Sequence, residues 1–269
     1  MQKFSNFYTD IYSYFVLKKK IDSKRIEKIF ALLRVDATFK TTSNNRMNDI
    51  NFKLLKYIKR FFSKKIIICD FGISSGQSTL ELYNNLKKKK IESIYGFDKQ
   101  IYLKIYKIKN LIFLYSKKND LLFIEYNKYC IRYRYFFIFK KLEKIFPYLF
   151  SIFNVKYKKS KVLIPNLDKI KQFKCFEQDI FNIEKKYFNL FDVVRVSNLL
   201  NYSYFPKSKL KTAIFNINKI TKENSILLLN RTSNKKKNIA SFFIKKRGKF
   251  KLLEDVNGGS EIKNLILSC

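Results

Sequence analysis

Residues 66–82, IIICDFGISSGQSTLEL, carry the strongest structural pattern in the chain. An apolar run ends at Asp70, and a turn rich in Gly and Ser follows. Gly72 and Gly76 in this turn are two of only six glycines in 269 residues. A glycine turn between a buried strand and a helix lets a ligand approach the backbone closely, and the helix N-terminus favours negative charge. The stretch therefore predicts a ligand site at the end of a strand.

Two familiar phosphate-binding turns do not match this stretch. The chain contains no GxxxxGK[ST], and the turn, Gly72-Ile73-Ser74-Ser75-Gly76, is not the GxGxxG fingerprint of dinucleotide-binding folds. A third interpretation starts from the carboxylate. Asp70 lies two residues before Gly72, where it can organise the loop amides or meet a cationic ligand.

The flanking sequence predicts alternating strands and helices. We expect helices at 75–90 and 207–220, strands within 64–72, 91–100, 173–183, 191–205 and 224–232, and a closing hairpin of two strands around 257–259. A strand, turn, helix and strand in succession form a βαβ unit, which implies a parallel sheet. The fold class expected is α/β.

The remaining segments predict additions to this core. Helices are expected at 7–33 and 48–62, with a polar connection at 36–45 between them. Residues 110–126 predict a hairpin turning at KKND, and 131–153 predict an amphipathic helix broken at Pro147. We therefore expect a helical N-terminal cap at 1–62, and a ligand-binding domain at 63–269 that contains an insertion at about 102–170.

Composition narrows the class of protein. The formal net charge is +36, but 48 of the 57 basic residues are Lys, and they are scattered among the Ile, Asn, Phe and Tyr that AT-rich codons specify. Two sources of this charge stay open: the base composition of the genome, and a partner such as nucleic acid or an anionic surface.

The cysteines and the missing histidine exclude several chemistries. Four cysteines without a CxxC, and no His, argue against a zinc site, a disulfide framework, and Ser-His or Cys-His catalysis. No apolar run approaches the roughly 20 residues of a membrane span, and the N-terminus lacks a clean signal peptide. These patterns predict a cytoplasmic protein without an integral membrane segment.

The turn resembles the first motif of class I S-adenosylmethionine-dependent methyltransferases, D/E-x-G-x-G-x-G. Asp70, Gly72 and Gly76 match, while Ser74 replaces the middle glycine. In that family the loop holds the methionine part and the sugar of the cofactor. The resemblance covers about 64–100 and 171–269. It implies S-adenosyl-L-methionine as cofactor and a Rossmann-like sheet of seven mostly parallel strands with an antiparallel last strand.

Further positions extend the resemblance. Asp98 ends the second strand, where the family places an acid on the ribose hydroxyls, and one carboxylate can accept from two adjacent hydroxyls. Asp179 follows the third strand, similar to the family acid that binds the adenine amine, with Ile180 as its neighbour. Arg46, just before the core, is either a contact to the cofactor carboxylate or a plain surface residue.

The segment FDVVRVSNLLNYSYF (191–205) resembles the fourth motif of chemotaxis receptor methyltransferases, with Ser197 in place of Arg. By this resemblance Asn198 contacts the cofactor, and Asn198 and Tyr202 are the candidate catalytic residues. The acceptor is open: a small molecule comes first, a protein carboxylate second and RNA third.

The alternative function is a non-catalytic protein of the methyltransferase fold that binds RNA or an anionic membrane surface through its basic face. A catalytic protein should keep a concave, cofactor-sized cavity at the carboxyl ends of the strands. A pure binding protein should fill it with side chains.

Overall fold

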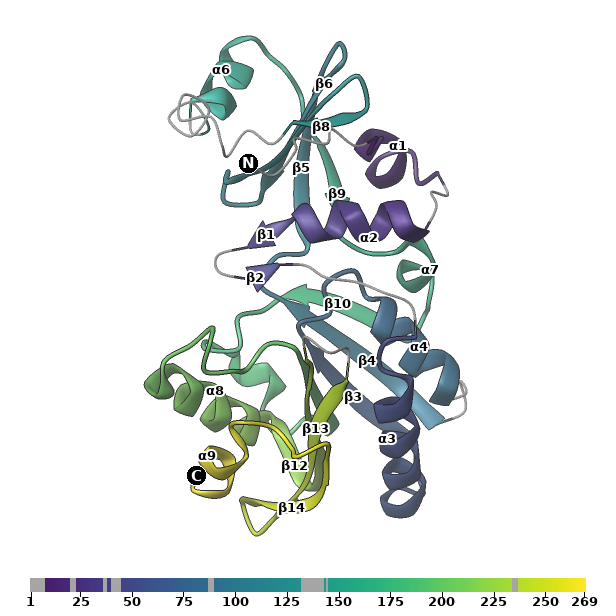
Figure 1. The fold of residues 1–269 in the computed structure, drawn as a ribbon, viewed down its shortest axis with the longest axis vertical. Coiled ribbons are helices and arrows are strands. Elements are labelled where there is room, and N and C mark those ends of the chain that lie inside the picture. The colour runs from purple at the N-terminus through teal and green to yellow at the C-terminus, as the bar shows by residue number, and fades with distance from the viewer. Residues whose placement is uncertain are drawn as a thin grey trace. The chain divides into compact units, whose positions relative to one another are not determined.

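The structure of the chain is a computed structural model that describes residues 8–19, 23–35, 38–39, 45–86, 90–131, 143, 145–233 and 237–269. Its contacts divide the chain into two units (Figure 1). One unit comprises Met1–Thr42 and Gln100–Leu163, and the other comprises Ser43–Lys99 and Ile164–Cys269. We call them the antiparallel unit and the parallel unit, after their main sheets.

This division differs from the expected one of a cap at 1–62 followed by a continuous domain. Residues 43–62 belong with the parallel unit, because the helix α3 (Asn48–Phe61) buries Ile50, Leu54 and Ile58 against its sheet. Residues 1–42 instead group with the segment at 100–163, close to the predicted insertion.

The parallel unit is built on a seven-stranded sheet. In spatial order the strands are β10 (Phe173–Glu177), β4 (Ile91–Asp98), β3 (Ile66–Phe71), β11 (Phe191–Ser197), β12 (Thr221–Thr232), β13 (Asn238–Lys246) and β14 (Lys249–Val256). The first five are parallel, and the pairs β12–β13 and β13–β14 are antiparallel.

Numbered along the chain within this unit, the strand order is 3-2-1-4-5-6-7. The order reverses between β3 and β11. This is a Rossmann-like α/β sheet, mostly parallel, as expected from the sequence. In such sheets ligands bind outside the carboxyl ends of the strands at the point of reversal.

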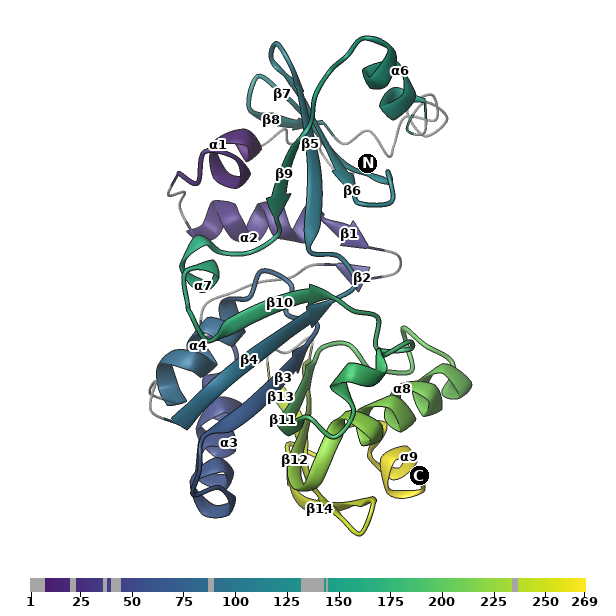
Figure 2. The ribbon, with the colours of Figure 1, turned by 180° about the vertical axis from the view of Figure 1, so that it is seen from behind.

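Helices cover both faces of this sheet. α8 (Lys207–Ile220) and α9 (Lys263–Leu267) pack on one face, and α3 and α4 (Gln77–Leu86) pack on the other (Figures 1 and 2). α8 forms because Leu210, Ala213, Ile214 and Ile217 recur at helical spacing and are at most 1% exposed. The short α7 (Pro165–Asp168) and the 3-10 turn η3 (Lys185–Tyr187) complete the unit.

The C-terminal expectation is wrong in one respect. β14 leaves the sheet at Val256, and residues 257–259 lead to α9 rather than to a returning strand. Leu265 and Ile266 are buried in the same apolar cluster as α8, so burial favours a helical turn there. The hairpin turn lies instead at Arg247-Gly248, where it connects β13 to β14. The sequence did not predict β13.

The antiparallel unit holds a five-stranded sheet and its covering helices. Its strands, in spatial order, are β8 (Tyr129–Ile131), β7 (Leu121–Tyr126), β6 (Leu111–Ser116), β5 (Tyr102–Ile108) and β9 (Lys158–Lys161). α1 (Ile11–Phe15) and α2 (Ser23–Leu32) cover one face, and α6 (Phe146–Ile152) packs on the other. β6 and β7 form the predicted hairpin about KKND.

Two local expectations in this unit need correction. The two-residue strands β1 (Arg34–Val35) and β2 (Thr38–Phe39) pair with each other. β1 lies just before the expected polar connection at 36–45, and β2 lies within it. α6 begins beside Pro147 rather than breaking there, because proline is tolerated in the first turn of a helix. Most of the expected helix at 131–153 lies outside the described residues. Among the helices that the structure describes, none is long and apolar enough to span a membrane.

Candidate functional site

The turn after β3 has an alternating backbone conformation. Gly72, Ser74 and Gly76 have φ angles of 75°, 54° and 80°, all in the left-handed region. The Gly72 amide donates to the Phe97 carbonyl at 2.8 Å, which ties the turn to the end of β4. A Cβ on Gly72 would lie 3.2 Å from the Ser197 carbonyl oxygen at the end of β11. The glycine spacing therefore follows from backbone geometry, and Ser74 occupies the position where a glycine is missing from the pattern.

Asp98 closes the turn from the neighbouring strand. Its Oδ2 accepts a hydrogen bond from the Ser74 amide at 2.9 Å, and its side chain is half-buried. The sequence predicts that Asp98 and the turn share one ligand site, and the structure brings them into direct contact. A carboxylate held against a concave turn of amides can bind a polar ligand such as a diol without reorganising.

Asp70 has a different environment from the one expected. It is 1% exposed, and the guanidinium of Arg195 binds it through two bonds, Nε to Oδ1 at 2.9 Å and Nη2 to Oδ2 at 2.5 Å. Thr79 donates to Oδ2 at 2.6 Å, and Arg195 also donates to Asn51 at 3.1 Å. The carboxylate is thus occupied by protein groups beneath the turn. Of the two roles expected for Asp70, this environment favours positioning of the turn, and a direct contact with the cofactor stays a prediction.

Arg195 has no role that follows from the sequence. It lies opposite Asp70 in the register of the adjacent strands β11 and β3. A buried arginine in a sheet interior needs a partner with matching geometry, and the bidentate carboxylate supplies it.

Asp179 and Ile180 follow β10 at the same edge of the sheet. Asp179 is 37% exposed, and its Oδ1 accepts from the Phe181 amide at 3.0 Å. Lys99 Nζ lies 3.9 Å from its Oδ2. Ile180 is 4% exposed and belongs to the apolar cluster under α8. The carboxylate of Asp179 is therefore accessible, whereas the side chain of Ile180 is a core residue.

Asn198 bridges the ends of two strands. Its Oδ1 accepts from the Thr232 amide at 2.7 Å, and its own amide donates to the Asn230 carbonyl at 2.8 Å. Its Nδ2 is buried and has no hydrogen-bond partner in the described part of the chain. A buried donor without a partner is costly, so this atom is suited to a ligand that completes its bonding.

The other two predicted residues, Tyr202 and Arg46, form hydrogen bonds with other segments of the chain. Tyr202 is 48% exposed, and its amide donates to Glu261 Oε1 at 2.8 Å. Arg46 precedes α3, and its carbonyl accepts from Asn238, the first residue of β13. The structure therefore gathers Gly72, Ser74, Gly76 and Asp98 around one turn. Asp179 and Asn198 follow the ends of β10 and β11, whereas Tyr202 lies in the loop after β11 and Arg46 precedes α3.

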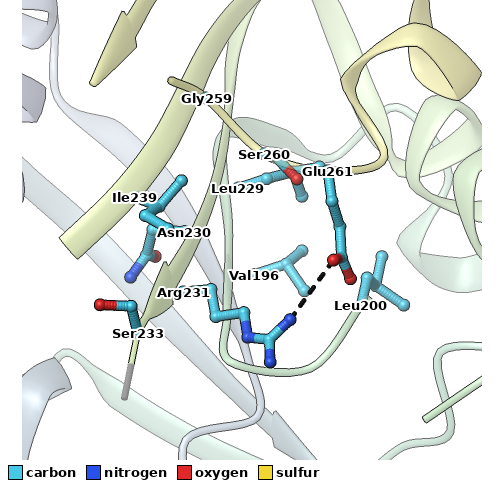
Figure 3. Close-up of a pocket in the computed structure, with 10 residues that line it drawn as sticks. All are labelled: Val196, Leu200, Leu229, Asn230, Arg231, Ser233, Ile239, Gly259, Ser260 and Glu261. Atoms are coloured by element: carbon cyan, nitrogen blue, oxygen red, sulfur yellow. Dashed lines mark hydrogen bonds and ion pairs between the residues drawn. The ribbon is translucent and has the colours of Figure 1, made fainter. Parts of the chain in front are cut away.

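A cavity of about 380 Å³ opens at the ends of β11 and β12 (Figure 3). Val196, Leu200, Leu229 and Ile239 give it an apolar lining, and Arg231 lies at its mouth. None of the predicted site residues lines it. Arg231 follows the buried apolar run of β12, as Asp70 follows the apolar run of β3. A polar residue after such a run is the signal in the sequence that indicates a further candidate ligand-binding position at the end of β12.

The cavity and the turn share one loop. A Cβ on Gly72 would lie 3.7 Å from Leu199 Cβ, while the next residue, Leu200, lines the cavity. The segment that ends β11 thus contacts the turn on one side and the cavity on the other. Two ligands bound at these places would be neighbours.

Known proteins that are similar to the chain are found among solved structures. No protein-family model and no curated protein sequence matches the chain. It is similar to the solved structure of N-methyltransferase NodS from Bradyrhizobium japonicum WM9 in complex with S-adenosyl-L-homocysteine. The identity is 12%, with 77% of this chain and 71% of that chain covered, and the TM-score is 0.39.

It is also similar to an S-adenosylmethionine-dependent methyltransferase from Aquifex aeolicus. The identity is 12%, with 80% of this chain and 74% of that chain covered, and the TM-score is 0.37. At these values the similarities carry no information on cofactor, acceptor or site residues. The resemblance of 191–205 to chemotaxis receptor methyltransferases stays a prediction.

Proposed function

We propose that the chain is an S-adenosyl-L-methionine-dependent methyltransferase whose cofactor site is the carboxyl edge of the parallel sheet. One observation carries this proposal. The left-handed turn after β3 is hydrogen-bonded to the acid that ends β4, beside the point where the strand order reverses. Turn, acid and reversal point together form a site for a ligand that contains a sugar.

The residues present fit this cofactor. A Cβ at Gly72 would crowd the Ser197 carbonyl, so the glycine keeps the turn close to the end of β11. The Asn198 Nδ2 at the same edge is a buried donor with no partner among the described residues. The turn amides, Asp98 and Asp179 would hold the methionine part, the ribose and the adenine in turn. Arg46 remains the candidate for the cofactor carboxylate. The cofactor, when bound, supplies an activated methyl group on its sulfonium.

The protein's own contribution to catalysis is then alignment and exclusion of water, which needs no histidine. The Asp70–Arg195 pair fixes β3 against β11, and so holds the turn beside Ser197 and Leu199. Asn198 is the candidate contact on the reacting side. Tyr202, at 48% exposure, would serve only if its ring turned inward.

The acceptor we propose is a small molecule, ahead of a protein carboxylate or RNA. The cavity of about 380 Å³ supports this choice, because its volume is in the range of sites for small molecules.

The test is calorimetric titration of the protein with S-adenosyl-L-methionine and S-adenosyl-L-homocysteine. Gly72→Ala should weaken binding at least tenfold, because the new Cβ both strains the turn and meets the Ser197 carbonyl. Gly248→Ala is the matched control, since Gly248 has a similar φ of 76° but a Cβ there would meet nothing within 4 Å. It should leave binding unchanged.

A second pair of variants tests the acid. Asp98→Asn should weaken binding, whereas Asp192→Asn should not. Asp192 also accepts a backbone N–H, from Ile67 at 2.8 Å, but it lies near the start of β11 at the opposite edge of the sheet. No binding of either compound by the folded wild-type protein would overturn the proposed function.

A further inference from the structure

The cavity beside the cofactor turn has an uneven distribution of polarity. Its lining includes four apolar side chains, which come from β11, β12, β13 and the loop after β11. Val196 and Leu229 are 2% exposed and continue into the hydrophobic core. Such a lining favours a ligand with an apolar body, and the volume of about 380 Å³ is in the range of small-molecule sites.

The polar part of the cavity lining contains one ion pair, formed by Arg231 and Glu261, whose side chains are 43% and 39% exposed. Arg231 and Glu261 point toward one another there, joined at 3.4 Å between Nη1 and Oε2 (Figure 3). Within the described ranges Glu261 is the only hydrogen-bond partner of the guanidinium. A guanidinium has five N–H donors, so most of its bonding capacity is left for another group.

Glu261 is fixed independently of Arg231. Its other oxygen, Oε1, accepts from the Tyr202 amide at 2.8 Å. Glu261 therefore holds the arginine by a single long contact and leaves the planar fork of the guanidinium open. That fork matches a carboxylate, which it can bind through two parallel hydrogen bonds.

We infer that this cavity binds a small carboxylate with an apolar body, whose carboxylate is held by Arg231. If the proposed function holds, this class of compound is the methyl acceptor, since the loop that ends β11 contacts both places. The net charge of +36 adds a general attraction for anions. Arg231 is then a residue that determines acceptor specificity.

The experiment is titration of the full chain with 3-phenylpropionate and with 3-phenylpropionamide, which has the same shape but no charge. Binding is followed by calorimetry and ligand-observed NMR, in the absence and presence of saturating S-adenosyl-L-homocysteine. We expect the carboxylate to bind at least tenfold more tightly than the amide.

Three variants define where the probe binds. Arg231→Gln should reduce the affinity for the carboxylate to that for the amide. Arg60→Gln removes the same charge from the last turn of α3 and should change neither. Ile239→Phe adds volume to a half-buried lining position and should weaken both compounds. Thermal melting of each variant establishes that it is folded.

Three results would each overturn the inference. The first is an amide that equals the carboxylate in affinity. The second is an effect of Arg60→Gln as large as that of Arg231→Gln. The third is tighter binding of 3-phenylpropylamine or phenyl phosphate than of 3-phenylpropionate, which would assign the cavity to another chemistry.

The same titrations separate this inference from the proposed function. Binding of the carboxylate probe without binding of S-adenosyl-L-homocysteine would leave the cavity assignment and overturn the methyltransferase. Binding of S-adenosyl-L-homocysteine without binding of the probe would leave the methyltransferase proposal and overturn the assignment of the cavity.

Discussion

Among the described residues each of the two units buries one carboxylate almost completely, and the two carboxylates have different partners. In the parallel unit Asp70 faces the guanidinium of Arg195, with Thr79 as an additional donor. In the antiparallel unit Glu125 on β7 is 0% exposed and accepts from the Thr9 hydroxyl and, at 2.8 Å, from the Ile11 amide. Its Oε1 has no partner within the described residues.

The two buried carboxylates have different structural roles. The pair in the parallel unit joins the neighbouring strands β3 and β11, so its geometry would support the proposed ligand site. Glu125 instead joins the N-terminal segment, at the start of α1, to the sheet of its own unit. Burial raises the pKa of the Glu125 carboxyl, against the opposing effect of its two hydrogen bonds.

The largest effect is expected from breaking the charge pair. Arg195→Met leaves Asp70 buried without a counter-charge, so the free energy of unfolding should fall by about 3–5 kcal/mol, as for other buried pairs that lose one partner. Urea denaturation measures the loss. The double variant Asp70→Asn/Arg195→Met should recover most of it, because no buried charge remains.

Arg231→Met is the control for this prediction. Arg231 also pairs with a carboxylate, but both side chains are about two-fifths exposed, at 43% and 39%. Its loss should cost less than about 1 kcal/mol. If Arg195→Met and Arg231→Met cost the same, the pair under the turn does not hold β3 and β11 together.

The second prediction concerns pH and the antiparallel unit. Because the pKa of Glu125 is raised in the folded protein, the folded protein holds this proton more tightly than the unfolded chain does. Stability should therefore fall as pH rises from the ordinary carboxyl pKa of 4.5 through the raised pKa of the folded protein. The loss should be about 1.4 kcal/mol for each pH unit that separates the two pKa values.

Hydrogen exchange of the β6 and β7 amides, measured across that pH window and expressed as protection factors, reports the effect within the unit. Glu125→Gln should remove the pH dependence of these protection factors. Glu92→Gln, at an exposed position on β4, should leave it in place. A pH dependence that survives in Glu125→Gln would assign the proton to another group.

The sequence predicts the parallel unit better than the antiparallel one, for a physical reason. The strand, glycine turn and helix at 66–86 are encoded locally, by an apolar run, positions that need φ above zero, and helical spacing. Asp98 was also predictable, because a strand end follows directly from its apolar run. These features depend on neighbours within a few residues.

What the sequence does not reveal depends on distant contacts. The bond between Asp70 and Arg195 requires the register of two strands 125 residues apart, which no local pattern contains. Glu125 lies in the strand LLFIEY, where an acid near the end looks exposed, and its burial results from the N-terminal segment. Likewise, 1–42 and 100–163 group into one unit through contacts across the chain. The cavity, lined by segments from 196 to 261, has the same origin.

The smallest effect is expected at the turns, where residues other than glycine have a positive φ in both units. In the described part of the antiparallel unit these residues are Asp, Asn and Lys, as at Lys109 with a φ of 50°. In the parallel unit Ser74 has the same conformation, between two glycines. Ser74→Gly and Lys109→Gly should each raise the free energy of unfolding by about 1 kcal/mol, because both relieve the same backbone strain.

The two substitutions differ in what they do to the ligand site. Ser74→Gly keeps the amide that binds Asp98, so it should retain or tighten the binding of S-adenosyl-L-homocysteine, while Lys109→Gly should not affect it. Ser75→Gly lacks any relief of a positive φ and removes the hydroxyl that accepts from the Gln77 amide, so it should destabilise the protein. A stabilisation by Ser75→Gly equal to that by Ser74→Gly would show that the left-handed conformation is not the source of the strain. The serine at 74 would then be a neutral replacement within the glycine pattern and not a position at which the turn is strained.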